Sequence, residues 1–180
     1  MKKKFFSMMA VLLITILMTS TVSAGAAIKL SKTVDWTLGS LDASGFVFGL
    51  GYTDVTVVLN ARGIPEVICT NQGGNQAPGQ NPAELAATGS QVLPGDDPLR
   101  KNGRSPFSVS AEPPATLPGS QGGCPNDNWI AEITFVFWTN ATISVYQGTD
   151  PNNLGPLLEQ QNYTCVTTHN PDSVTCTPVP

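Results

Sequence analysis

Apolar and polar side chains alternate with a period of two along most of the chain, and no long stretch shows the helical period. The clearest run is Trp129–Trp138, in which the odd positions are apolar, and the alternation resumes over Ala141–Val145 after two polar residues. We predict that these two runs form a β-hairpin. A second hairpin is predicted for the alternating segments 46–50 and 55–61, which flank a glycine-containing turn.

Shorter alternating segments extend this pattern over the rest of the chain. Near its start, the apolar positions change from even to odd numbers at Gly39-Ser40, which predicts a β-bulge. We count about nine or ten strands in residues 25–180, and such spacing favours an all-β fold: a two-sheet antiparallel β-sandwich, immunoglobulin-like in general architecture. We expect residues 25–180 to form a single domain. The shorter predicted strands are Glu66–Thr70, Glu84–Val92, Ser105–Ala111, Leu157–Thr168 and Ser173–Cys176.

Long loops rich in Gly, Pro, Asn and Gln separate the predicted strands. Residues 71–82 contain no charged side chain, and residues 113–128 have a similar composition. A third irregular segment, residues 94–104, carries both acidic and basic side chains. Loops of this length in a compact domain are usually functional or disordered. We therefore expect the amide-rich loops to take part in binding.

The first residues have the organisation of a secretory signal peptide. Lys2, Lys3 and Lys4 precede an uncharged run over residues 5–18, and Val22-Ser23-Ala24 ends in small residues. We predict a signal peptide of residues 1–24, with cleavage after Ala26 and an uncleaved anchor as alternatives. No later apolar run has the roughly 20 residues that a membrane-spanning helix needs. The sequence thus predicts a secreted protein, extracellular or at the cell surface, with no transmembrane helix after cleavage.

The charge balance argues against nucleic acid as a partner. The whole chain has a formal net charge of −4, and without the three leader lysines six basic residues remain against thirteen acidic ones. Nucleic-acid binding needs a basic face, so we expect no such partner. The polar surface instead consists largely of neutral groups, among them 20 Asn and Gln residues after position 24.

Four cysteines in a secreted chain predict disulfide bonds. A turn at His169–Asp172 would fold the C-terminal segment into a hairpin with Cys165 opposite Cys176, within disulfide reach. Cys69 and Cys124 would then form the second bridge, and the other two connectivities stay open. Metal ligation is not expected, because the chain has no Cys-x-x-Cys and a single histidine.

Few residues are available for acid–base chemistry. His169 lies in the predicted turn, where a solvated side chain is expected, and Asp96-Asp97 lies in a loop. We therefore predict no catalytic residue, no cofactor and no enzyme activity, with a secreted hydrolase of unrecognised type as an alternative. Asn126–Asn128 and Asp150–Asn153 offer oxygen atoms to calcium, but turn formation is the favoured interpretation.

Two aromatic residues are candidates for stacking against a ligand. The alternation places Trp138 and Tyr146 on the polar faces of their strands, and Trp129 on the apolar face. Exposed rings beside Asn and Gln side chains suit a neutral sugar. A carbohydrate-binding module that uses Trp138 and Tyr146 is therefore an alternative function.

Two segments carry a resemblance to known proteins. The segment Cys69–Pro82, CTNQGGNQAPGQNP, together with Cys124–Trp129, CPNDNW, resembles a group of uncharacterised secreted bacterial proteins. The resemblance extends from about Leu50 to Tyr146. It implies secretion, and it carries no activity or binding residue over to this chain.

These observations favour a secreted, non-enzymatic β-sandwich with a structural, adhesive or binding role. The expected partner is an extracellular glycan or matrix component, bound through the amide-rich loops. Sheet edges could also serve self-association by strand addition.

Overall fold

The structure is a computed structural model that describes residues 27–180, which contain eleven strands and no helix. The predicted signal peptide, residues 1–24, lies outside the described residues. Within residues 27–180, no helix has the length and apolar character needed to cross a membrane. The strands are β1 (Lys29–Leu30), β2 (Asp35–Thr37), β3 (Leu41–Phe48), β4 (Val55–Thr70), β5 (Gln76–Pro78), β6 (Leu85–Leu93), β7 (Ser105–Ala111), β8 (Thr116–Pro118), β9 (Ile130–Gln147), β10 (Leu157–Thr168) and β11 (Ser173–Pro178).

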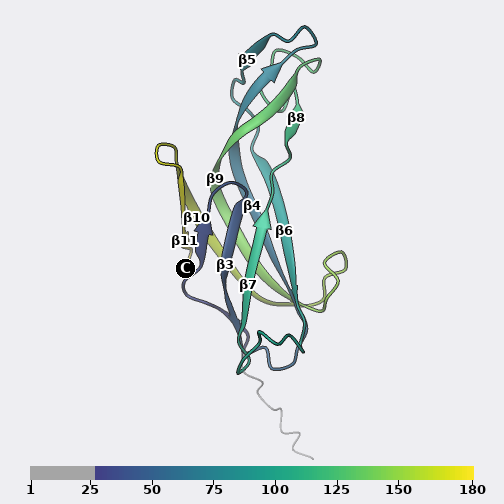
Figure 1. The fold of residues 1–180 in the computed structure, drawn as a ribbon, viewed down its shortest axis with the longest axis vertical. Coiled ribbons are helices and arrows are strands. Elements are labelled where there is room, and N and C mark those ends of the chain that lie inside the picture. The colour runs from purple at the N-terminus through teal and green to yellow at the C-terminus, as the bar shows by residue number, and fades with distance from the viewer. Residues whose placement is uncertain (1–26) are drawn as a thin grey trace, which may run out of the picture.

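The strands form two antiparallel sheets that pack against each other (Figure 1). In the smaller sheet, β7 runs along one edge of β3, while β1 and β2 share the other edge. In the larger sheet, β4 and β9 are paired in the centre, with β6 beside β4 and the order β10, β11 beyond β9. One main core of inward-facing side chains fills the space between the sheets. The predicted all-β sandwich is confirmed.

Both predicted hairpins are wrong, because strand pairing differs from strand order. Residues 130–147 form one continuous strand, since the two polar residues in their middle continue along β4 instead of turning. Residues 46–48 and 55–61 belong to different sheets, so the turn between them crosses the sandwich. The predicted bulge at Gly39-Ser40 is also wrong, because these two residues form part of the turn of the β2–β3 hairpin. Gly39 has φ +140° there, a backbone conformation that other residues rarely adopt.

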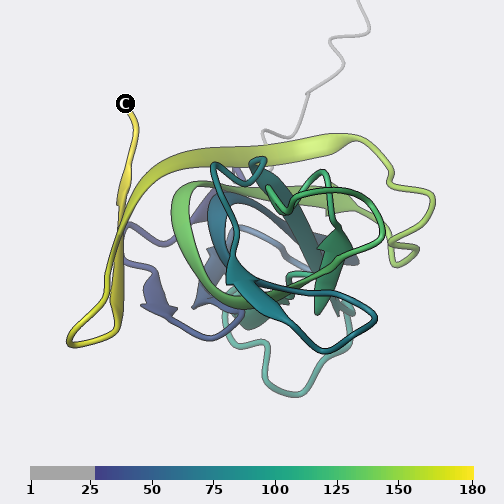
Figure 2. The same ribbon diagram turned by 90° about the horizontal axis from the view of Figure 1, so that it is seen from above.

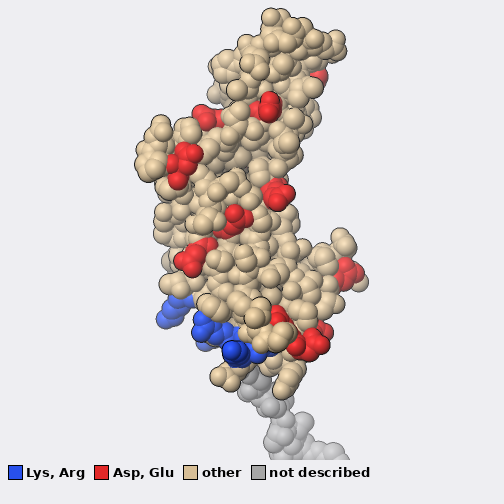
Figure 3. Space-filling view, viewed as in Figure 1, with Lys and Arg blue, Asp and Glu red and all other residues tan. Residues whose placement is uncertain are grey.

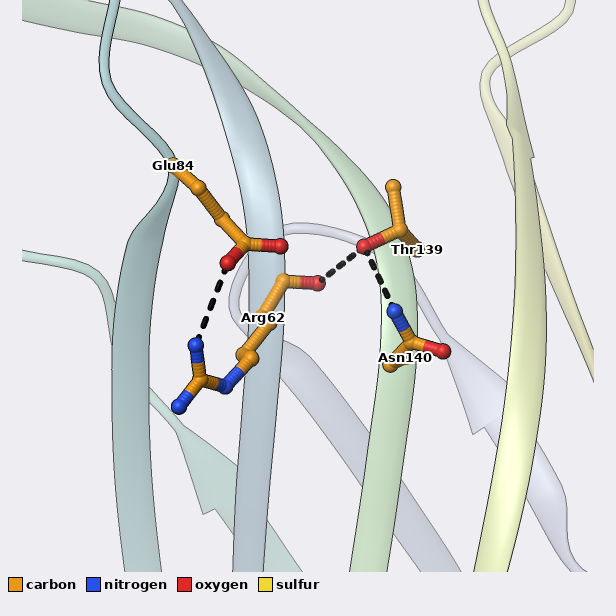
Figure 4. A network of polar contacts seen from close by, with 4 residues as sticks. All are labelled: Arg62, Glu84, Thr139 and Asn140. Carbon is orange, nitrogen blue, oxygen red and sulfur yellow. Dashed lines mark hydrogen bonds and ion pairs between the residues drawn. The ribbon is translucent and has the colours of Figure 1, made fainter.

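Two β-bulges interrupt the pairing of β9 with β4. The register skips one residue of β9 at Thr134 and another at Thr139. The hydroxyl of Thr134 donates to the Glu66 carbonyl, and that of Thr139 donates to the Arg62 carbonyl (Figure 4). Threonine thus bonds across to β4 at the two places where the β9 ladder is broken.

Each bulge moves the inward-facing positions of β9 by one residue, because side chains alternate strictly along a strand. Ala131 is buried before the first bulge, Val136 and Trp138 are buried between the bulges, and Ala141 is buried after the second. The predicted exposure of Trp138 is therefore wrong: its exposed fraction is 1%, and it belongs to the main core.

Strands β4 and β9 continue beyond the sandwich and form its narrow upper end (Figure 1). We call this part the tip; it also contains β5, β8 and the loops 71–75 and 119–129. A second, small core of Val67, Cys69 and Ala131 lies within it. The Cys69–Cys124 disulfide joins the loop after β8 to β4, as predicted. Seen from above, the tip loops gather over the end of the two long strands (Figure 2).

The C-terminal hairpin is confirmed residue by residue. Strand β10 pairs with β11 so that Thr168 faces Ser173 and Cys165 faces Cys176. These two cysteines form the second disulfide, with their Cα atoms 4.0 Å apart. In Figure 2 the hairpin projects to one side of the sandwich.

Candidate functional site

The middle of β9 has a free backbone edge on the side away from β4. Strand β8 pairs with β9 only over residues 130–132, and β10 pairs with it only from Asn140 onward. Between these limits, residues 133–138 pair with no other strand than β4 in the described part of the chain. We call this segment the open edge. Two hydrogen bonds reach the ends of this segment. The Ile133 N–H donates to the Ala115 carbonyl, and the Thr167 hydroxyl donates to the Trp138 carbonyl.

A groove of about 590 Å³ runs beside the open edge, a volume within the usual range of ligand pockets. Its walls are residues 133–136 of the open edge, the end of β2 and the start of β11. Within the described residues, β2 pairs only with β3 and β11 only with β10, so three unpaired strand edges meet around the groove. The lining residues are 36–39, 113, 133–136 and 172–174.

Trp36 forms part of the apolar wall. Its ring packs edge-to-face on Tyr163, with ring centroids 5.0 Å apart. The indole N–H of Trp36 is buried and has no hydrogen-bond partner among the described residues.

Tyr163, which packs against Trp36, makes the stability of the fold dependent on pH in the alkaline range. Burial raises the pKa of its phenol from 10.0 to about 12. The folded state therefore holds this proton more tightly than the unfolded chain, so the contribution to stability is complete below pH 10 and is lost between pH 10 and 12. We expect the free energy of unfolding to fall over this interval, and to fall less in a Tyr163→Phe protein. Denaturant titrations at several pH values measure this.

Tyr52 supplies the control for this experiment, because its side chain is 92% exposed. A Tyr52→Phe protein should lose stability over the same pH interval as the parent. An equal loss in the parent and the Tyr163→Phe protein would contradict the assignment.

The turn of the β10–β11 hairpin forms the polar end of the groove. His169 Nδ1 lies 2.6 Å from Asp172 Oδ1, and the imidazole packs on Phe135 of the open edge, with ring centroids 4.6 Å apart. The hydroxyls of Thr168 and Ser173 lie 2.7 Å apart across the hairpin. Among the described residues, no hydrogen bond joins His169 to a hydroxyl group. The histidine therefore anchors the hairpin turn on β9.

The tip holds a smaller cleft of about 390 Å³ on the outer face of its sheet. Amide and hydroxyl side chains surround an exposed Ile130 there. Some of the predicted binding amides are occupied by the loop itself, because the Asn71 side chain accepts the backbone N–H groups of Gly73 and Asn75. The polar residues of the cleft are Thr70, Asn71, Gln72, Gln76, Thr116, Asn128 and Glu132.

The Asn and Asp clusters considered for calcium form turns. Asn126 accepts the Asn128 backbone N–H, and Asp150 accepts that of Asn152. Hydrogen bonds from Ser120 lower the pKa of Asp127. Residues 27–180 contain no group of three or more His, Cys, Asp or Glu side chains placed to hold a metal ion.

The two aromatic residues proposed for sugar stacking do not form a common surface. Trp138 is in the main core, as described above, whereas Tyr146 is half-buried near the other end of β9. Tyr146 lies between Thr56 of β4 and Leu157 of β10. Trp129, expected in the core, is half-buried against the small core of the tip.

Comparison with known proteins does not identify the chain. It matches no protein family, and neither the curated proteins nor the solved structures give a significant match.

The groove was not predicted from the sequence, because its lining residues form no motif. Only the abrupt polar interruption at Thr139 and Asn140 hinted at an irregular β9.

Proposed function

We propose that this protein is a secreted, non-enzymatic binding protein of the cell exterior that takes an extended polypeptide segment into the groove. The segment would add as a strand to the open edge of β9. The observation that carries this proposal is the pairing of residues 133–138 with β4 alone, in a strand whose two flanks are both covered. Two disulfides among the described residues are compatible with an oxidising exterior compartment.

The length of the open edge suits a short strand. Six residues of β9 span about 20 Å, at about 3.3 Å per residue. An added strand would receive main-chain hydrogen bonds from the open edge, and its alternate side chains would face the wall formed by Trp36 and Val136. Its outer side chains would meet the hydroxyl and carboxylate groups of Ser173 and Asp172.

A polypeptide suits this site better than a glycan. Strand addition uses backbone N–H and C=O groups, which a sugar cannot match in register. The aromatic platform expected for a sugar is missing, since Trp138 is buried. The turn of the β10–β11 hairpin, and not the groove, brings His169 and Asp172 together as a hydrogen-bonded pair.

A random peptide library displayed on phage tests the proposal with the chain from Gly25 as bait. We expect enriched peptides with alternating apolar residues, and we expect Ser173→Trp, which fills the groove, to abolish their binding. Thr175→Trp is the matched control, because Thr175 is exposed on the same strand but does not line the groove. Isothermal titration with the selected peptides measures both effects.

N-methylation of the selected peptide distinguishes strand addition from other modes of binding. Only alternate residues of an added strand bond to the open edge, so methyl groups in one phase should weaken binding about tenfold each, and in the other phase should change little. The proposal is wrong if no peptide is enriched, if Ser173→Trp binds normally, or if both phases respond equally.

A further inference from the structure

The basic residues of the described chain are concentrated at the end of the sandwich opposite the tip. Figure 3 shows the Lys and Arg side chains of this face gathered at the lower end, while acidic side chains extend from the upper part of the molecule down to the lower end, where one group lies beside the cations. Of the six basic residues in the described range, Arg62 is paired with Glu84 at 3.2 Å. Arg100 donates to the carbonyls of Thr53 and Leu93 and so braces the basal loops.

Three of the four remaining cations, Lys29, Lys101 and Arg104, adjoin apolar side chains on the outer face of the smaller sheet. The guanidinium of Arg104 stacks over the Phe46 ring, 3.4 Å from its centroid, and lies 5.5 Å from that of Phe48. Lys29 is directly opposite Phe48 in the sheet, so both project to the same side. We call the surface of Lys29, Phe46, Phe48, Leu99, Lys101 and Arg104 the basal face.

The cations of the basal face have no acidic partner among the described residues, and two of its apolar side chains are exposed to solvent. Lys29, Lys101 and Arg104 form no salt bridge with any described residue. Leu99 is 65% exposed and Phe48 is 38% exposed. Leu99, Lys101 and Arg104 surround a depression of about 250 Å³ over Phe46. An exposed apolar patch among cations is unusual on a soluble domain with few charges.

We propose that the basal face docks on a lipid membrane rich in anionic phospholipid. Its lysine and arginine side chains would meet headgroup phosphates, while Leu99 and Phe48 would enter the interfacial layer. A soluble polyanion would satisfy the cations but would leave these two side chains in water. Outside the basal face the described chain carries thirteen acidic side chains and three basic ones, so an anionic membrane favours an approach by the basal face.

The course of the chain agrees with this orientation. The described chain begins at Ala27, two residues before Lys29, and therefore enters the fold at the basal face. The groove and the tip would then face away from the lipid.

Vesicle co-sedimentation tests the proposal with the chain from Gly25, independently of the groove. At low salt we expect binding to vesicles of equal parts phosphatidylglycerol and phosphatidylcholine, and none to phosphatidylcholine alone. Each removed cation should lower the partition coefficient about fivefold, so Lys29→Gln combined with Lys101→Gln should lower it about 25-fold. Arg62→Gln, a basic residue outside the basal face, should change it little.

A second pair of variants separates lipid from a soluble polyanion. Leu99→Ser should weaken vesicle binding severalfold, whereas Leu157→Ser, an exposed leucine on β10, should not. Dextran sulfate serves as the lipid-free probe. Absence of binding to the anionic vesicles overturns the proposal. It is also overturned if Leu99→Ser is without effect and dextran sulfate binds as tightly as the vesicles, which would indicate a polyanion partner.

Discussion

Replacement of Trp138 by alanine is expected to destabilise the protein by about 3–5 kcal/mol, the usual cost of deleting a buried large aromatic side chain. Trp138 is 1% exposed and packs in the main core between the two bulges of β9. Its indole N–H has no hydrogen-bond partner among the described residues, so no side-chain hydrogen bond is lost with the ring. The midpoint and slope of urea denaturation, followed by far-ultraviolet circular dichroism, give the change.

Phe137 is the matched control for this prediction. It is the preceding residue in the sequence, but the bulge at Thr134 turns it to the opposite face of β9, where it is half-buried beside Phe135. We expect Phe137→Ala to cost clearly less than Trp138→Ala. A larger destabilisation by Phe137→Ala than by Trp138→Ala would contradict the assignment of Trp138, and not Phe137, to the core-facing side of β9.

This pair of residues also shows how far alternation predicts the fold. The period of two identified most of the strands, the sheet class and the C-terminal hairpin, because each depends on a short local pattern or on one turn. It missed β5 and β8, which lie in the two segments expected to be loops. The alternation gave the wrong buried face where a bulge inserts one extra residue into β9, because nothing in the local sequence marks the insertion. Phe135 and Phe137 look like core positions and Trp138 looks exposed, unless the two bulges are known.

The groove could not be predicted for a related reason. Its open edge exists because β8 begins only at Thr116, opposite Glu132, and β10 pairs with β9 only from Asn140 onward, and both limits depend on the register of strands far apart in the sequence. Trp36 and Ser173 come together there from opposite ends of the chain. Local patterns indicate which residues form strands, but an unpaired strand edge is a property of the assembled sheet.

The largest change in the organisation of the molecule is expected from removing the Cys69–Cys124 disulfide. The bridge spans a sequence separation of 55, so a Cys69→Ala/Cys124→Ala protein should lose about 4 kcal/mol of stability by loop entropy. The Cys165→Ala/Cys176→Ala protein, which opens a separation of only 11, should lose about 3 kcal/mol. Urea denaturation of the two proteins under identical conditions measures the difference.

Hydrogen exchange shows where the first loss occurs. The tip has a small core of Val67, Cys69 and Ala131, and the bridge is the covalent link between β4 and the loop that covers this core. Without it, the bond from the Gln80 N–H to the Gly123 carbonyl should open locally, and its amide should exchange faster. Amides that join β4 to β6 in the sandwich should lose only the protection expected from the fall in global stability. If Gln80 exchanges no faster than those amides predict, the tip is held by its backbone contacts and the disulfide acts only on the unfolded chain.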